Sequence, residues 1–128
     1  MRYHVGRDSD AEHVYRAEAE VDRTLPSGSM NLDDALDWIT RIAHAEDVEP
    51  PGLFCSRLQG RTVAFACLTN HAIVVGSRMP TRLTILHEFV HLTTSVSHGR
   101  EFQRELIRLT RTHLSMQHSL LLSSRLKP

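Results

Sequence analysis

The chain has 128 residues, of which 41% are hydrophobic and 23% are charged. This length suits one domain, so we expect residues 1–128 to fold around a single core. The composition is typical of a globular protein and excludes the collagen-like, coiled-coil and disordered classes. Fifteen basic residues balance fifteen acidic ones, and the resulting net charge of zero excludes a polybasic nucleic-acid binder.

The zero total hides a segregation of charge along the chain. Residues 1–50 carry five arginines against twelve acidic residues, a net charge of −7. Residues 51–128 carry ten basic residues against three glutamates, a net charge of +7. Such an asymmetry between halves indicates that the two parts of the chain present different surfaces.

Nothing in the sequence indicates export or a membrane. The N-terminal residues lack the apolar stretch of a signal peptide, and no apolar run reaches the roughly 18–20 residues of a membrane span. Cys55 and Cys67 do not make a disulfide framework, and we expect them to be buried free thiols. We therefore expect a soluble cytoplasmic protein without membrane contacts.

The N-terminal part of the chain predicts two helices. Apolar residues at helical spacing indicate a helix over about 10–24, with Asp8 or Ser9 as its N-cap. After a break at 26–29, Asn31 caps a second helix and Asp34 occupies the capping-box position. Prolines and a glycine at 50–52 end this helical region.

The remainder predicts strands and then helices. Strands over 53–58 and 62–68 are separated by Gln59-Gly60-Arg61, which favours a hairpin, and a third strand over 72–75 follows a second turn. Helices are then expected over about 82–95, 100–114 and 117–126. This order predicts an α+β fold, in which helices pack on a small antiparallel sheet of about three strands.

The sequence His87-Glu88-Phe89-Val90-His91 is an HExxH motif. Its two histidines lie one helical turn apart on one face, so both imidazoles can reach one metal ion. Glu88 is placed to reach a water molecule at that metal without binding the metal itself, which suits a general base. The alternative is a helix with two partly buried, hydrogen-bonded histidines.

A catalytic zinc ion usually has three protein ligands and one water molecule. His98 is the candidate third ligand, because a helix that ends near residue 95 and a tight turn at Gly99 would bring it back to the metal. Glu101 and Glu105 are rival ligands from the following helix, and their spacing to later arginines also suits surface ion pairs.

The segment TILHEFVHLTTSVSHGREFQRELIRL, residues 84–109, resembles the active-site segment of SprT-like zinc metallopeptidases. Among these, the chain is most similar to small actinobacterial and actinophage metallohydrolases, which combine HExxH with an HGxEF context. These also begin with an RDS…VY.AE segment, matched here over 7–9 and 14–18. The step of seven residues from His91 to His98 differs by one from the spacing in metzincins, which argues against assigning the chain to that group of zinc peptidases.

The resemblance implies a minimal zincin-like fold, a bound Zn²⁺ and hydrolysis of peptide bonds. It assigns His87, His91 and His98 as the metal ligands and Glu88 as the catalytic carboxylate. A protein or peptide would be the substrate, and the strand over 72–75 is either a sheet edge for an extended peptide or a covered core strand. Candidate donors to the oxyanion are His113, His118, Tyr3 and Arg100, between which the sequence does not choose.

Four arginines form a stripe along the helix that follows His98. Arg100, Arg104, Arg108 and Arg111 recur at helical spacing on one face. We expect this face to be solvated or to pair with the acidic N-terminal helices, and a nucleic-acid or acidic-protein surface is the alternative.

The sequence as a whole predicts a zinc-dependent metallopeptidase. The alternatives are a zinc hydrolase of a non-peptide bond and a non-catalytic DNA- or protein-binding module with structural histidines. The oligomeric state is left open.

Overall fold

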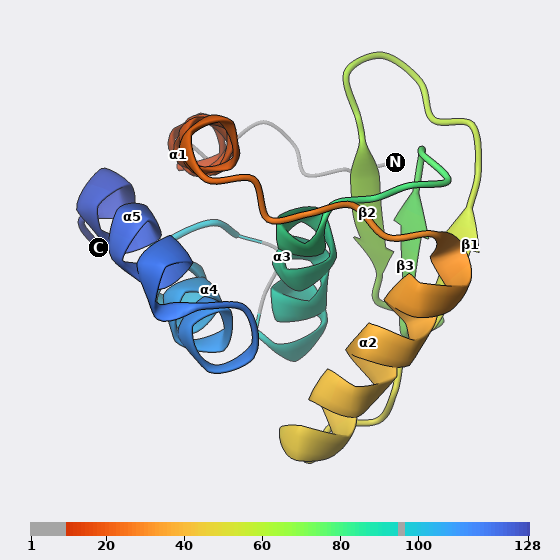
Figure 1. Cartoon of the computed structure of the whole chain (residues 1–128). Helices are drawn as coiled ribbons and strands as arrows, with labels where there is room; N and C mark the ends of the chain where they lie inside the picture. The colour runs from red at the N-terminus through yellow and green to blue at the C-terminus, as the bar shows by residue number, and fades with distance from the viewer. Residues whose placement is uncertain (1–9, 95–96) are drawn as a thin grey trace.

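The computed structural model describes residues 10–94 and 97–128 of the chain. These residues form five helices and a three-stranded sheet, the α+β architecture predicted from the sequence (Figure 1). In chain order the elements are α1 (Ala11–Thr24), α2 (Leu32–Ala45), β1 (Gly52–Cys55), β2 (Ala64–Cys67), β3 (Ala72–Val75), α3 (Arg82–Thr93), α4 (Arg100–His113) and α5 (Met116–Leu126).

The helix boundaries follow the capping signals of the sequence. The side chain of Asn31 accepts a hydrogen bond from the backbone N–H of Asp34 at 2.8 Å, which confirms the predicted N-cap of α2. Asp10 occupies the N-cap position of α1, whereas the predicted caps Asp8 and Ser9 lie outside the described residues. Each predicted helix is present, and the described ends agree to within two residues except at the C-terminus of α2, which stops at Ala45, before the predicted break at 50–52.

The sheet is mixed, and the predicted antiparallel meander is wrong. Its strand order is β1-β3-β2, with β1 parallel and β2 antiparallel to β3. A turn does form at Gln59, whose carbonyl accepts from the N–H of Thr62, but β1 and β2 on either side of it do not pair. The segment 56–63 instead crosses from one edge of the sheet to the other, so that β3 inserts between them (Figure 1).

The apolar character of β3 explains its central place. Ile73 and Val75 are fully buried, and strands that are buried on their faces are apolar throughout. Turn signals report where the chain reverses but not which strands become neighbours. The strand order was therefore decided by burial, which a local pattern does not encode.

Helix α3 lies at the centre of the molecule, between the sheet on one side and α4 on the other (Figure 1). Residues 85–91 are buried without interruption, so α3 is enclosed on all sides rather than amphipathic. This is why its polar residues, which include the HExxH motif, lie inside the protein.

The linker between α1 and α2 fixes the start of α3. The N–H of Arg82 donates to the carbonyl of Gly28 at 2.9 Å, and the N–H of Leu83 donates to Oγ of Ser27 at 3.2 Å. Gly28 adopts a φ of 92°, a left-handed conformation in which glycine is favoured, and the Arg82 side chain passes close to it. The N-terminal turn of α3 is thereby tied to a segment more than fifty residues earlier.

Two expectations about the cysteines and the membrane can be compared with the structure. Cys55 and Cys67 are both free, but Cys55 is exposed on the edge strand β1 and Cys67 is partly buried, so the prediction that both are buried is wrong. No helix among the described residues combines the length and the apolar character that a bilayer crossing requires.

Candidate metal centre

His87 and His91 project from the same face of α3, one turn apart. Their exposed fractions are 2% and 8%, so both imidazoles lie inside the protein. Thr81 caps the helix by accepting from the N–H of Thr84 at 3.1 Å, and this holds the start of the helix in register. The helical spacing predicted from HExxH is confirmed.

His98 reaches the same place from outside α3. It lies directly before Gly99, the N-cap residue of α4, and is 3% exposed. The side-chain amide of Gln103 donates to the carbonyl oxygen of His98 at 2.9 Å. The first turn of α4 therefore holds the backbone of His98, and this turn fixes where the imidazole points.

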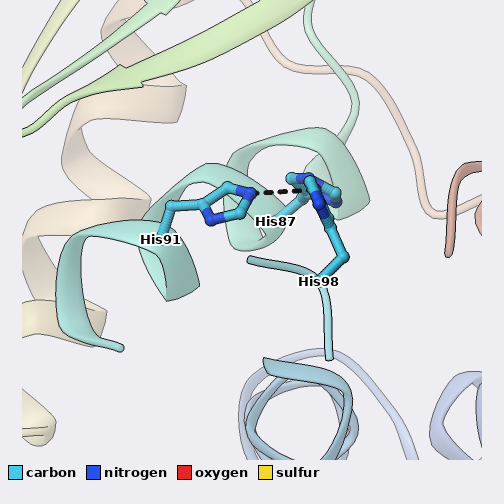
Figure 2. A group of neighbouring side chains, drawn as sticks. All are labelled: His87, His91 and His98. Carbon is cyan, nitrogen blue, oxygen red and sulfur yellow. Dashed lines mark hydrogen bonds between the residues drawn. The ribbon is translucent and has the colours of Figure 1, made fainter. Parts of the chain in front are cut away.

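The Nε2 atoms of the three histidines converge (Figure 2). His98 Nε2 lies 3.2 Å from Nε2 of His87 and 3.0 Å from Nε2 of His91. One ligand nitrogen from each ring lies within 4.8 Å of the others. Imidazole nitrogens bound at about 2.0–2.1 Å to a tetrahedral zinc ion lie about 3.3 Å apart, so the observed spacing fits such an ion after a small expansion. The three histidines could therefore hold a metal ion.

The donor set is compatible with a cation at this point. Nε2 of His98 lies at hydrogen-bond distance from Nε2 of both other rings. A shared metal ion could instead accept a lone pair from each of the three rings.

Two residues of α1 that the sequence analysis did not identify as site residues contact His87. Oε2 of Glu18 lies 2.5 Å from Nδ1 of His87, and the ring of Tyr15 stacks on the same imidazole with centroids 5.2 Å apart and planes inclined by 16°. Glu18 and Tyr15 lie within the segment 14–18 that carries part of the family resemblance, which was the only sequence signal for them.

Phe102 of α4 packs against all three imidazoles. Its ring centroid lies 4.9 Å from those of His87 and His98 and 4.5 Å from that of His91. The side chain is 1% exposed and belongs to the hydrophobic core. An apolar floor beneath the rings restricts their rotation and keeps water away from one side of the site.

Glu88 is 3% exposed and lies beside His87 on α3. The rival third ligands are occupied elsewhere or face solvent. Glu101 is exposed, and Glu105 binds the guanidinium of Arg108 at 2.8 Å. Among the residues that the structure describes, the group that could hold a metal ion consists of histidines only.

A cleft of about 910 Å³ opens beside the triad and is bounded by α1, the start of α3 and the chain that enters β2. His98 is the member of the triad that lines this cleft, and Tyr15 and Glu18, which contact His87, line it as well. β3 is the central strand, so it is the covered core strand and not the sheet edge. The edge strand at the cleft is β2. The cleft is lined by Ala11, Glu12, Tyr15, Glu18, Ala19, Asp22, Arg61, Thr62, Val63, Ala64, Leu83, Thr84 and His98.

The four residues considered as oxyanion donors have other contacts or positions. Both ring nitrogens of His118 are engaged, one by the hydroxyl of Ser115 at 2.6 Å and the other by a backbone carbonyl of residue 25 at 2.9 Å. His113 binds Glu46 at 2.8 Å. The remaining candidates are Arg100, which is exposed at the start of α4, and Tyr3, which lies outside the described residues.

One arginine of the stripe on α4 pairs with the acidic N-terminal half, as one interpretation of the sequence anticipated. Arg108 donates to Glu46 at 2.6 Å and to Glu105 at 2.8 Å. The hydrogen bond from Arg108 holds the pKa of the Glu46 carboxyl below its usual value, against the opposing effect of burial. The other three arginines of the stripe, Arg100, Arg104 and Arg111, are exposed.

Comparison of the chain with protein-family models and with curated protein sequences finds no match. The similarity of residues 84–109 to SprT-like metallopeptidases therefore stays a prediction. What the chain can do is inferred below from the geometry of the site.

Proposed function

We propose that the protein is a zinc-dependent hydrolase of peptide bonds, with His87, His91 and His98 as the metal ligands and Glu88 as the general base. The observation that carries the proposal is the convergence of three buried Nε2 atoms, with a buried glutamate next to His87 in the chain and with His98 in the wall of a cleft. Three nitrogen ligands are typical of a catalytic zinc site that keeps one position open.

A zinc ion at the triad would supply Lewis-acid polarisation of a substrate carbonyl and of a water molecule. Glu88 takes a proton from that water as its oxygen bonds to the carbonyl carbon, and delivers the proton to the leaving nitrogen as the C–N bond breaks. Glu88 starts and finishes the reaction as a carboxylate. Glu88 is buried, so bulk water has little access to the proton transfer.

A peptide is the substrate class that the surroundings of the triad favour. The cleft has a volume of about 910 Å³, and β2, whose residue Ala64 lines it, forms an edge of the sheet. An exposed strand edge offers backbone donors and acceptors to an extended peptide. Apolar wall residues such as Val63, Ala64 and Leu83 suit substrate side chains of moderate size.

The metal requirement is tested first. Protein purified without chelator and then supplied with zinc should contain about one zinc ion per chain, and His91→Ala should contain none. Absence of zinc from the wild-type protein would overturn the metalloenzyme proposal in favour of a non-catalytic module.

The reaction is tested with Glu88→Gln, which preserves the shape of the side chain but cannot accept the proton. Cleavage of a mixed peptide library, measured by mass spectrometry, should fall by about 10²–10⁴-fold, with the zinc content unchanged. Glu101→Gln, an exposed glutamate on α4, is the matched control and should retain full activity. A zinc-loaded protein that cleaves no peptide would favour hydrolysis of a non-peptide bond instead.

A further inference from the structure

Helix α1 presents two side chains, one turn apart, to a single imidazole on α3. Tyr15 and Glu18 are three residues apart and so lie on one face of the helix. Tyr15 stacks on the ring of His87, and Glu18 meets its Nδ1 atom at 2.5 Å. The contact joins residues 69 positions apart in the sequence.

The hydrogen bond to Glu18 determines which nitrogen of His87 is available to a metal. A carboxylate is only an acceptor, so Nδ1 of His87 carries the proton that it donates. In the neutral ring the lone pair is then on Nε2, the atom that meets His98 at 3.2 Å. Glu18 thus selects the tautomer in which His87 can act as a ligand at the triad.

Glu18 and Tyr15 also restrict the orientation of the ring. The carboxylate holds one edge of the imidazole, and the stacked phenol covers one face, while Phe102 meets the ring at 63° from another side. The Glu18 side chain is 14% exposed and that of His87 is 2% exposed. In such a poorly solvated place a hydrogen bond to a charged acceptor is stronger than it is in water.

The position of α1 is set by contacts away from the triad. Val14, Ala17 and Val21 are buried, and α1 packs along α5. At one end of this packing His13 binds the backbone carbonyl of Leu126 at 3.0 Å, whereas the surface pair between Glu20 and Arg125, at 3.5 Å, contributes little. The C-terminal helix therefore holds α1 in place, so Glu18 is in position whether or not a metal is bound.

We propose that Glu18, supported by Tyr15, is a positioning residue that sets the metal affinity of the triad by fixing the tautomer and orientation of His87. This inference rests on the proposed metal site. Partners of this kind raise the basicity of a ligand imidazole, and their removal typically weakens metal binding by about 10–100-fold. Glu18 acts only through His87 and takes no part in bond breaking.

The experiment measures zinc affinity by competition with a chromophoric chelator. Glu18→Gln keeps an acceptor oxygen but removes the charge, and it should weaken zinc binding by about 10-fold. Glu18→Ala removes the acceptor as well, and it should weaken zinc binding by close to 100-fold. Tyr15→Phe retains the stacked ring and should keep nearly the wild-type affinity. Glu20→Gln, on another face of the same helix, is the matched control and should bind zinc as the wild type does.

A second measurement separates positioning from a general loss of structure. Cobalt(II) reports its ligand geometry in its visible spectrum, so Glu18→Gln should change that spectrum while its metal-free circular dichroism matches the wild type. If both Glu18 variants bind zinc as tightly as Glu20→Gln does, the positioning role is wrong even though the triad binds metal. If the wild-type protein binds neither zinc nor cobalt, the proposed function itself fails.

Discussion

Of the described contacts between the acidic N-terminal half of the chain and its basic C-terminal half, two, the inner and the outer junction, are made by largely buried glutamates. At the inner junction Glu18 of α1 meets His87 of α3 at 2.5 Å. At the outer junction Glu46, at the end of α2, binds Arg108 at 2.6 Å and His113 at 2.8 Å, both on α4. Both use a glutamate to connect helices that are more than sixty residues apart.

The two junctions differ in how far their side chains are exposed to solvent. Both oxygens of Glu46 are used by cationic or imidazole groups near the surface, and the side chain of Arg108 is 42% exposed. The inner junction is buried, and the far nitrogen of His87 points at two further imidazoles. The same kind of contact therefore holds helices together near the surface, whereas in the interior it orients one imidazole of the triad.

The largest effect should come from the metal at the inner junction. Zinc at about 1,000 times its dissociation constant should stabilise the folded protein by about 4 kcal/mol, because it binds the folded state alone. For a chain of this size that corresponds to a rise in Tm of roughly 15 °C, which calorimetry measures. His98→Ala should abolish the zinc-dependent rise, and Glu46→Gln should keep it in full. A full rise in His98→Ala would place the metal elsewhere.

The next effect concerns the outer junction. Glu46→Gln should lower the free energy of unfolding by about 1–2 kcal/mol, since it removes the charge that binds Arg108 and a partly exposed pair is screened by solvent. Urea unfolding at neutral pH measures this loss, and zinc affinity should not change. Glu49→Gln, a nearby exposed glutamate, should be neutral. A Glu46→Gln variant with weakened zinc binding would break the distinction between the two junctions.

The pH dependence of stability sharpens this second prediction. The folded state lowers the pKa of Glu46, so its stabilising contribution is present above its ordinary value of 4.5 and is lost as the pH falls through the lower folded value. The difference in unfolding free energy between the wild type and Glu46→Gln should therefore shrink as the pH falls below about 4.5. A difference that stays constant down to pH 3 would contradict the assignment of the lowered pKa to Glu46.

The smallest effect is expected for exposed arginines on α4, the helix that carries Arg108. Arg100→Ala and Arg104→Ala should each change the unfolding free energy by less than about 0.5 kcal/mol. We expect the salt dependence of any DNA binding to be the same in these variants as in the wild type, because Arg108 of the same stripe is already paired with glutamates. If each substitution instead reduces the slope of log affinity against log salt concentration by about one, the arginines contact phosphates and the face is a nucleic-acid surface.

Much of the site could be predicted because its signals are local. The spacing of His87 and His91 requires only a helix, and His98 was chosen because a turn at Gly99 follows a helix end. Both inferences use residues within a dozen positions of one another. The caps and breaks that delimit the helices are local in the same sense, which is why the described helix boundaries match the predicted ones closely.

The missed features all depend on long-range contacts. Nothing near Glu18 or Tyr15 indicates that α1 would pack over α3, since that placement is set by α5 at the far end of the chain. The prediction of the strand order was wrong for the same reason. The burial of Ile73 places β3 at the centre of the sheet, and the turn before β3 does not. Such contacts depend on how whole faces pack against one another.

The sequence by itself determined the α+β class, the helices and the grouping of three histidines, because helical periodicity and capping act over a few residues. Only the tertiary structure decided that Nε2 of each ring faces the same point, that Glu18 contacts His87, and that Glu18 and Glu46 meet the C-terminal half in different surroundings. Those outcomes depend on which apolar faces bury one another, and burial is a property of the folded chain as a whole.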